Sequence, residues 1–458
     1  MAAPMEMGES ARAMAERHAQ LVGDFEQKRR EKAIVVSTND RTVRNQLRQL
    51  GEPITLFGER EPERRERLRK LLAKLDHEQG GVAMVVDDEP EPVEEVTKEL
   101  FYTEGPPELK AWRTGIVRYS LGRAAKRVGL QRAQFDDLEG YEAAQVRDAE
   151  KGKAVMQQSS ELGDDRPISG CRFAGDGSYL ATCSWSGAFK LWSLPECRKA
   201  LTVRAHDERC TGIATHPESG AGRSSEVVSV VTASADSTAK LWGAEGKLLH
   251  ALEGHTDRLA RVEFYPDGSK VGTCSFDKTW RLWDVETGAH ILEQEGHSRA
   301  VYGIAFQGDG ALAVTGGLDG VGRVWDLRSG RSVCVLEGHV KGILACDFSP
   351  NGHTLATGSQ DHTCKLWDLR KKGTTSCPVM YTIAAHLSLV SQVRFEPSGG
   401  HALMTAGYDK LLKLWSTRDF SLVASLASHE GKIMGADMLP GLECLASVSY
   451  DRTIKLWK

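Results

Sequence analysis

One short motif recurs along the C-terminal two-thirds of the chain, and it restricts the fold more than any other feature. Its clearest copy is Lys365-Leu366-Trp367-Asp368, and every copy places a basic residue, an aliphatic residue and a tryptophan in that order. The seven tryptophans are Trp192, Trp242, Trp283, Trp325, Trp367, Trp415 and Trp457. A period of about 40–45 residues is typical of a β-propeller with four strands per blade. We therefore predict an all-β seven-bladed propeller over residues 152–458, preceded by an extended, mainly helical N-terminal region.

A histidine and an aspartate accompany most of these tryptophans. With Gly-His near its start and Trp-Asp near its end, the repeat resembles that of the WD-repeat family. We expect the aspartate of one turn to accept a hydrogen bond from the histidine of a neighbouring loop, while a serine holds the histidine and the tryptophan completes the network. In the three clearest copies these residues are His255, Ser275, Asp277, Trp283, His339, Ser359, Asp361, Trp367, His429, Ser449, Asp451 and Trp457.

Taken alone, Ser359, His339 and Asp361 could pass for a nucleophile, a base and an orienting acid. Because near-copies recur in equivalent turns, whereas an enzyme needs one such site, we interpret them as structural. Ser186 replaces the aspartate in the first copy, and Gly317 and Gly407 replace the serine in the fourth and sixth. These exchanges predict weaker networks in blades 1, 4 and 6.

The last repeat ends in its third strand, so blade 7 has no fourth strand of its own. An open strand edge is a liability that propellers usually remove by closing the ring. We predict that residues 154–161, just before the first repeat, pair with residues 454–457 and close the ring.

Helical periodicity and charge divide the N-terminal region into four predicted parts. These are an amphipathic helix at 1–33, a helical partner-docking motif at 34–75, an acidic linker at 76–109 and a basic helical segment at 110–151.

An apolar strip, Pro53-Ile54-Thr55-Leu56-Phe57, separates the two predicted helices of the second part. Such a strip is unfavourable in water, so Pro53, Ile54, Leu56 and Phe57, together with Leu68 and Leu71, are predicted to dock on a partner protein. The alternative is that the strip packs back on its own helices or on the propeller.

A second resemblance rests on the residues around this strip. The run from Ile34 through Leu50-Gly51-Glu52-Pro53-Ile54-Thr55-Leu56-Phe57-Gly58-Glu59, and then Arg64-Arg65-Glu66-Arg67-Leu68-Arg69, is similar to the splicing-factor motif of the pre-mRNA processing factor four family. That family is the WD-repeat protein of the U4/U6 small nuclear ribonucleoprotein. The resemblance implies a non-catalytic nuclear scaffold of the U4/U6.U5 tri-snRNP. It also implies a companion U4/U6-specific splicing factor, a nuclear cyclophilin bound at Gly51–Leu72, and U4/U6 snRNA as partners.

The basic segment contains seven lysines and arginines and two aromatic residues between Lys110 and Arg132. Distributed cations contact phosphates and flat rings stack on unpaired bases, which favours RNA. The residues predicted to lie near RNA are Lys110, Trp112, Arg113, Arg118, Tyr119, Arg123, Lys126 and Arg127. The alternative is a helix that packs on the propeller and leaves its basic face in solvent.

Aromatic residues also precede the turn aspartates, on the face of the propeller that carries the His-Asp turns. Trp185, Phe276, Tyr408 and Tyr450 occupy this position, and nearby loops add Arg258, Arg299, Lys341 and Lys432. Aromatic side chains rimmed by cations suit a protein or ribonucleoprotein partner. The alternative is that these aromatic residues pack against adjacent loops.

Several function classes are not favoured by the sequence. There is no metal-ligating cysteine spacing, no phosphate-binding loop and no run of apolar residues long enough for a membrane helix, and the ten cysteines suit buried reduced thiols. We therefore expect no metal, cofactor, small-molecule substrate or membrane. The remaining alternatives are a peptide-reading adaptor such as a ubiquitin-ligase substrate receptor, and an enzyme.

Overall fold

The computed structural model describes residues 34, 36, 40–56, 59–78, 107–220, 228–371 and 376–458. The expected helix at 1–33 and most of the expected acidic linker lie outside these ranges. The chain divides into two compact units, Met1–Thr97 and Lys98–Lys458. Each is described by itself.

In the first unit, helices α2 (Asp40–Gln49) and α3 (Glu61–Glu78) pack against each other. Val43 and Leu47 recur on one face of α2 and are fully buried against Leu68 of α3. Asp40 begins α2, where a negative charge suits the helix N-terminus, and it also pairs with Arg64 at 2.5 Å. Gly51 follows α2 with φ of 73°, a left-handed conformation that glycine adopts readily.

The second unit contains a ring of seven four-stranded antiparallel sheets, which confirms the predicted seven-bladed propeller. Blades 1 to 6 each use four consecutive strands, and blade 7 combines three strands with one from before blade 1. Blade 1 contains β2 (Ile168–Phe173), β3 (Tyr179–Ser184), β4 (Ala188–Ser193) and β5 (Arg198–Arg204). Blade 2 contains β6 (Cys210–Thr215), β7 (Val228–Ser234), β8 (Ala239–Gly243) and β9 (Leu248–Leu252). Blade 3 contains β10 (Leu259–Phe264), β11 (Lys270–Ser275), β12 (Trp280–Asp284) and β13 (His290–Gln294). Blade 4 contains β14 (Val301–Phe306), β15 (Leu312–Gly317), β16 (Gly322–Asp326) and β17 (Arg331–Leu336), and blade 5 contains β18 (Ile343–Phe348), β19 (Thr354–Ser359), β20 (Cys364–Asp368) and β21 (Val379–Ile383). Blade 6 contains β22 (Val390–Phe395), β23 (Ala402–Gly407), β24 (Leu411–Ser416) and β25 (Leu422–Ala427). Blade 7 contains β26 (Ile433–Met438), β27 (Leu445–Ser449), β28 (Thr453–Trp457) and β1 (Gln157–Leu162). A short 3-10 helix, η1 (Pro440–Leu442), precedes β27.

Strand β1 closes the ring. It pairs antiparallel with β28 from Gln157 opposite Trp457 to Leu162 opposite Thr453. Met156 and Lys458 extend the ladder with two backbone hydrogen bonds of 2.9 Å. The predicted closure of blade 7 by the segment before the first repeat is therefore confirmed.

The repeated tryptophans form the contacts between blades. Trp283 of blade 3 packs with Leu241 of blade 2, and Trp192 of blade 1 packs with Ile454 and Leu456 of blade 7. Because each blade buries its tryptophan against the preceding one, a motif repeated once per blade produces a core that continues around the whole ring.

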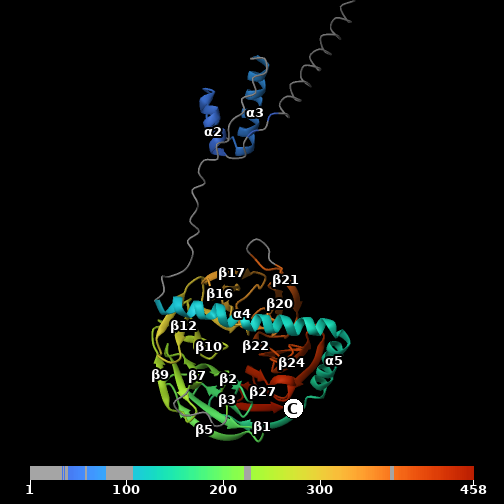
Figure 1. The fold of residues 1–458 in the computed structure, drawn as a ribbon. Helices are drawn as coiled ribbons and strands as arrows, with labels where there is room; N and C mark the ends of the chain where they lie inside the picture. The colour runs from blue at the N-terminus through green and yellow to red at the C-terminus, as the bar shows by residue number, and fades with distance from the viewer. Residues whose placement is uncertain are drawn as a thin grey trace, which may run out of the picture. The chain divides into compact units, whose positions relative to one another are not determined.

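Two helices, α4 (Pro107–Asp136) and α5 (Leu138–Ala154), connect to the ring before β1. In Figure 1, α4 lies across the ring and α5 follows the side of the ring that carries β24. Leu109 and Ile116 of α4 are buried in the core cluster shared by blades 3 and 4, whereas Val155, which follows α5, joins the cluster of blades 6 and 7. The helical segment and the residue after it thus contact the ring at blades 3 and 4 and again at blades 6 and 7.

The cysteine prediction is wrong at two positions. Cys334 and Cys377 form a disulfide, while the other eight cysteines are free thiols, seven of them buried. A parallel bridge between Val335 and Ser376 brings the two sulfur-bearing residues together, because it lays the end of the connection between β20 and β21 alongside β17.

Candidate docking sites

Each network on the His-Asp face links four side chains. In blade 5, His339 Nδ1 lies 2.8 Å from Asp361, His339 Nε2 lies 2.8 Å from Thr357 Oγ1, and the indole of Trp367 donates to the same Oγ1 at 2.8 Å. The other networks built on a histidine repeat this order, with Ser447 in place of threonine in blade 7. Both ring nitrogens of the histidine therefore have hydrogen-bond partners, and the network stabilises the turn.

The role expected of the serines is wrong. Ser359 forms no hydrogen bond with His339; its hydroxyl donates to the carbonyls of Lys341 and Gly342 and accepts the backbone N–H of Asp361 at 3.2 Å. Ser275 bonds its turn in the same manner, and Ser449 accepts the corresponding N–H of Asp451. The histidine is held by a threonine or serine two positions before this serine, for example Thr357 in blade 5. A threonine or serine recurs ten residues before each repeated tryptophan, so the sequence contains a signal for this position.

The three blades expected to be weak differ from one another. Blade 1 has no histidine in its network; Asp164, which precedes β2, accepts instead from Ser184 and Ser186. In blades 4 and 6 the His-Asp-Thr-Trp chain is intact, with His297 3.1 Å from Asp319 and His386 2.8 Å from Asp409. The glycines in these blades remove only the hydrogen bonds that the serine would make.

The networks predict how stability depends on pH. Burial tends to raise the pKa of Asp361, but hydrogen bonds from His339 and Thr363 outweigh it and lower that pKa below its usual range. A carboxylate with a lowered folded-state pKa stabilises the fold above its unfolded pKa of about 3.9, and this contribution is lost as the pH falls. We expect His339→Gln to lower the free energy of unfolding by about 1–3 kcal/mol at pH 7. The difference from wild type should shrink below about pH 3, where Asp361 is protonated in the unfolded chain. Denaturant titrations at pH 7 and below about pH 3 measure this difference in the free energy of unfolding. The exposed Lys341→Gln in the same loop is the control.

On the His-Asp face, three of the four predicted aromatic residues meet around one cavity. Trp185, Phe276 and Tyr408 line a hollow of about 220 Å³ at the mouth of the central channel. Tyr450 lies outside the hollow, 49% exposed, with its ring edge-on to Trp185 at 5.7 Å. Of the predicted cations, Arg258 lies 3.9 Å from the ring centre of Phe276 and Lys432 lies 5.2 Å from that of Tyr408. This gives an aromatic surface whose cations already contact the rings.

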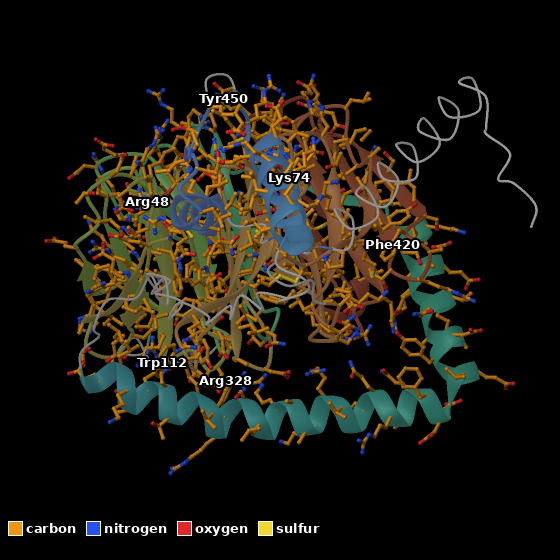
Figure 2. All side chains as sticks on the ribbon, turned by 90° about the horizontal axis from the view of Figure 1, so that it is seen from above. Arg48, Lys74, Trp112, Arg328, Phe420 and Tyr450 are labelled. Carbon is orange, nitrogen blue, oxygen red and sulfur yellow. A yellow bond between two sulfur atoms is a disulfide. The ribbon has the colours of Figure 1, made fainter. Side chains whose placement is uncertain are left out.

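The basic helix α4 packs on the opposite face of the ring. Figure 2 shows Trp112 on this helix and Tyr450 at the far side of the propeller. Trp112 and Tyr119 contact Tyr265 of blade 3, with ring centres 5.5 Å and 6.0 Å apart. Both rings are thus half-buried against the propeller, as the packed-helix alternative expects. The signal was the three- or four-residue spacing of Leu109, Trp112, Ile116 and Tyr119, which places them on one helix face.

The predicted cations of α4 fall into two groups. Arg127 is bound to the propeller through Asp309 at 2.7 Å and the carbonyl of Asn351 at 2.9 Å, and Arg123 bonds the hydroxyl of Tyr119. Arg113 is half-buried against Gly330, whose φ of 72° and missing Cβ leave room for the guanidinium. Lys110, Arg118 and Lys126 are exposed. Arg123 is exposed as well and bonds the neutral hydroxyl of Tyr119, so the predicted cations that present their charge to solvent are Lys110, Arg118, Arg123 and Lys126.

The described residues of the apolar strip in the first unit differ in exposure. Pro53 and Leu56 are exposed, Leu56 by 49%, and Ile54 is half-buried, while Phe57 lies outside the described residues. The backbone around them is fixed: Arg67 donates to the Pro53 carbonyl at 2.8 Å and the Leu56 N–H donates to Glu59 at 3.0 Å. Arg67 also pairs with Glu59 at 2.7 Å. The backbone of the described part of the strip is thus held in place, with Pro53 and Leu56 exposed and Ile54 half-buried.

Leu68 and Leu71 differ from the strip. Leu68 is fully buried between the helices, so it holds the pair together and is not available to a partner in this structure. Leu71 is partly buried at the edge of the same cluster.

Among the residues that the structure describes, no group of three or more histidine, cysteine or acidic side chains is placed to hold a metal ion. None of the described helices is both long and apolar enough to cross a membrane.

Comparisons with known proteins agree with this architecture. Residues 43–71 match the model of the family described as pre-mRNA processing factor 4 (PRP4) like, and six segments match the WD domain, G-beta repeat: 157–193, 246–284, 288–326, 330–368, 377–416 and 420–458. The structure places a seventh blade between the first two segments, where Thr215 and Val228 are joined by a long connection. Fold and matches together define a WD-repeat propeller protein with an N-terminal splicing-factor motif.

Relatives identify the family. The U4/U6 small nuclear ribonucleoprotein PRP4-like protein of Arabidopsis thaliana is 48% identical over 462 residues, 99% of this chain and 81% of that protein. The U4/U6 small nuclear ribonucleoprotein PRP4 of Saccharomyces cerevisiae is 41% identical over 92% of this chain and 90% of its own length. The human protein Prp4 is 44% identical over 45% of this chain and 40% of its own length. The chain therefore belongs to the PRP4 family, as its resemblance predicted.

Proposed function

We propose that the chain is a non-catalytic scaffold of the nuclear U4/U6 and U4/U6.U5 particles and acts in pre-mRNA splicing. Its relatives carry the name of U4/U6 small nuclear ribonucleoprotein proteins. The repeated Ser, His and Asp residues of the described ring are engaged in seven turn networks, which fits a scaffold better than an enzyme.

The observation that carries the proposal is the exposed strip Pro53–Leu56. It lies within the segment that matches the PRP4 model, and the contacts of Arg67 and Glu59 hold its backbone while Pro53 and Leu56 stay exposed. Fixing a binding segment in advance reduces the ordering entropy lost on association. A structured apolar segment left in water is best explained by a protein partner.

The partners follow from the same family membership. We assign a nuclear cyclophilin to Gly51–Leu72, and the companion U4/U6-specific splicing factor to the docking surfaces as a set. U4/U6 snRNA is assigned to the exposed Lys110, Arg118 and Lys126, since phosphate contacts need accessible cations.

Loss of the strip should release protein partners selectively. We expect the full-length double variant Ile54→Ala and Leu56→Ala to retain partner proteins from nuclear extract at least about tenfold more weakly, because each buried aliphatic side chain contributes about 1.5–3 kcal/mol. Mass spectrometry of the retained proteins and northern blots of U4 and U6 snRNA measure the effect. Leu422→Ala is the matched control, since Leu422 is 48% exposed on β25. Equal retention by both variants would contradict the assignment of the strip.

The cavity on the His-Asp face supports one other candidate, a peptide-reading adaptor such as a ubiquitin-ligase substrate receptor. That function would make binding independent of the first unit. The strip variant separates the two functions, because an adaptor would keep its partners.

A further inference from the structure

The cavity at the mouth of the propeller channel has a basic lining. Besides aromatic rings, Arg209, Arg258 and Arg261 line it, and no acidic residue does. In the described part of the chain, no carboxylate forms an ion pair with any of these three guanidiniums.

The opposite end of the same channel is arranged differently. There Arg172 and Arg394 are paired with acidic residues: Arg172 with Glu263, and Arg394 with Glu263 and Asp347, both at 3.2 Å. Two arginines of the channel therefore have internal partners. Among the described residues, the three arginines at the mouth have no acidic partner within ion-pair distance.

Arg261 occupies the base of the mouth. Its guanidinium reaches across the channel to the carbonyls of Ser391 and Met434, at 3.4 Å and 3.5 Å. These are long contacts with neutral acceptors, so a charged acceptor would bind it more strongly. In the same wall, the buried hydroxyl of Thr211 has no hydrogen-bond partner among the described residues.

The other two arginines are held by rings. Arg258 lies over Phe276 at 3.9 Å and Arg209 lies 5.6 Å from the centre of Trp185. A cation–π contact fixes a guanidinium while leaving its N–H groups to other acceptors. Tyr302, whose ring meets that of Phe276 edge-on at 6.3 Å, and Tyr408 complete an apolar wall for the stem of an inserted side chain.

We propose that this mouth binds an extended acidic segment of a partner protein, with one anionic side chain inserted toward Arg258 and Arg261. The volume of about 220 Å³ is below the roughly 300–1,000 Å³ of small-molecule sites and suits a single side chain. The anion is a glutamate or aspartate carboxylate or a phosphoserine, which share the bidentate chemistry that arginine recognises. The proposal rests on the proposed scaffold function and names the chemistry of one of its contacts.

Fluorescence anisotropy with the full-length protein tests it. The probes are three fluorescein-labelled nonapeptide pools that are random on both sides of a central glutamate, phosphoserine or glutamine. We expect the glutamate or the phosphoserine pool to bind, the glutamine pool to bind at least about tenfold more weakly, and Arg258→Gln to weaken the anionic pools by about tenfold or more. Preference between the two anionic pools identifies the source of the charge.

Arg331→Gln is the matched control, because Arg331 is exposed on β17 away from the mouth. Phe276→Ala is a second variant that removes the ring under Arg258 and should also weaken binding, and thermal unfolding verifies that each variant is folded. Equal binding of the glutamine pool, absence of binding by every pool, or equal effects of Arg258→Gln and Arg331→Gln would overturn the proposal. If Arg258→Gln still retains U4/U6 proteins through the strip while the pools fail to bind, only this inference falls and the scaffold function stands.

Discussion

Replacing Leu68 with alanine is expected to unfold the α2–α3 pair while the propeller stays folded. Leu68 is fully buried, and with Val43 and Leu47 it forms the buried centre of the cluster between the two helices. A buried Leu→Ala change costs about 2–5 kcal/mol, and a unit with so small a core has little more stability than that. Hydrogen exchange read by mass spectrometry should show loss of protection across residues 40–49 and 61–78 only.

Leu56→Ala is the matched comparison, because Leu56 is 49% exposed. It should leave amide protection unchanged while weakening partner retention, so the two leucines separate folding of the motif from its docking. Protection that survives Leu68→Ala would mean that the helix pair is not held by this cluster.

Breaking the pairing of β1 with β28 is expected to destabilise the whole ring. The double change Ser160→Pro and Glu161→Pro removes two adjacent backbone N–H groups, at least one of which faces the partner strand. The loss should be on the order of 3 kcal/mol, which lowers the thermal midpoint by roughly 5 °C for a propeller of about 300 residues. Differential scanning calorimetry measures the midpoint.

A threonine pair at the same positions is the control. The side chains of β1 are almost all exposed, so its contribution comes from the backbone, and Ser160→Thr with Glu161→Thr should unfold close to wild type. The open edge of β28 should also make the proline variant associate, which size-exclusion chromatography detects. A proline variant as stable and monomeric as the threonine variant would show that closure by β1 does not stabilise the ring.

The fold was predictable because its main signal repeats. One tryptophan per blade marks the contact with the preceding blade, and the missing fourth strand of blade 7 pointed to the segment before Ile168. Local networks were harder: Ser359 stands nearer in sequence to Asp361 than Thr357 does, yet the strand geometry directs Thr357 at His339.

The docking sites were predictable only in part. A strip between two helices could be recognised, but whether Leu68 or Leu56 faces the neighbouring helix depends on how α2 and α3 pack. For α4, positive charge suggested RNA, whereas the apolar spacing of Leu109, Trp112 and Ile116 determined the face that meets the ring. The bond between Cys334 and Cys377 had no spacing signal, since 43 residues separate them.

The pairing of β1 with β28 also means that the ring can close only at the end of translation. The ribosome makes β1 before any blade and β28 after six blades are complete, so at about 5–20 residues per second β1 waits on the order of half a minute for its partner. Until then the nascent ring has an unpaired strand at each side of the gap. A nascent chain therefore cannot complete the seven-bladed ring until its last repeat has been translated.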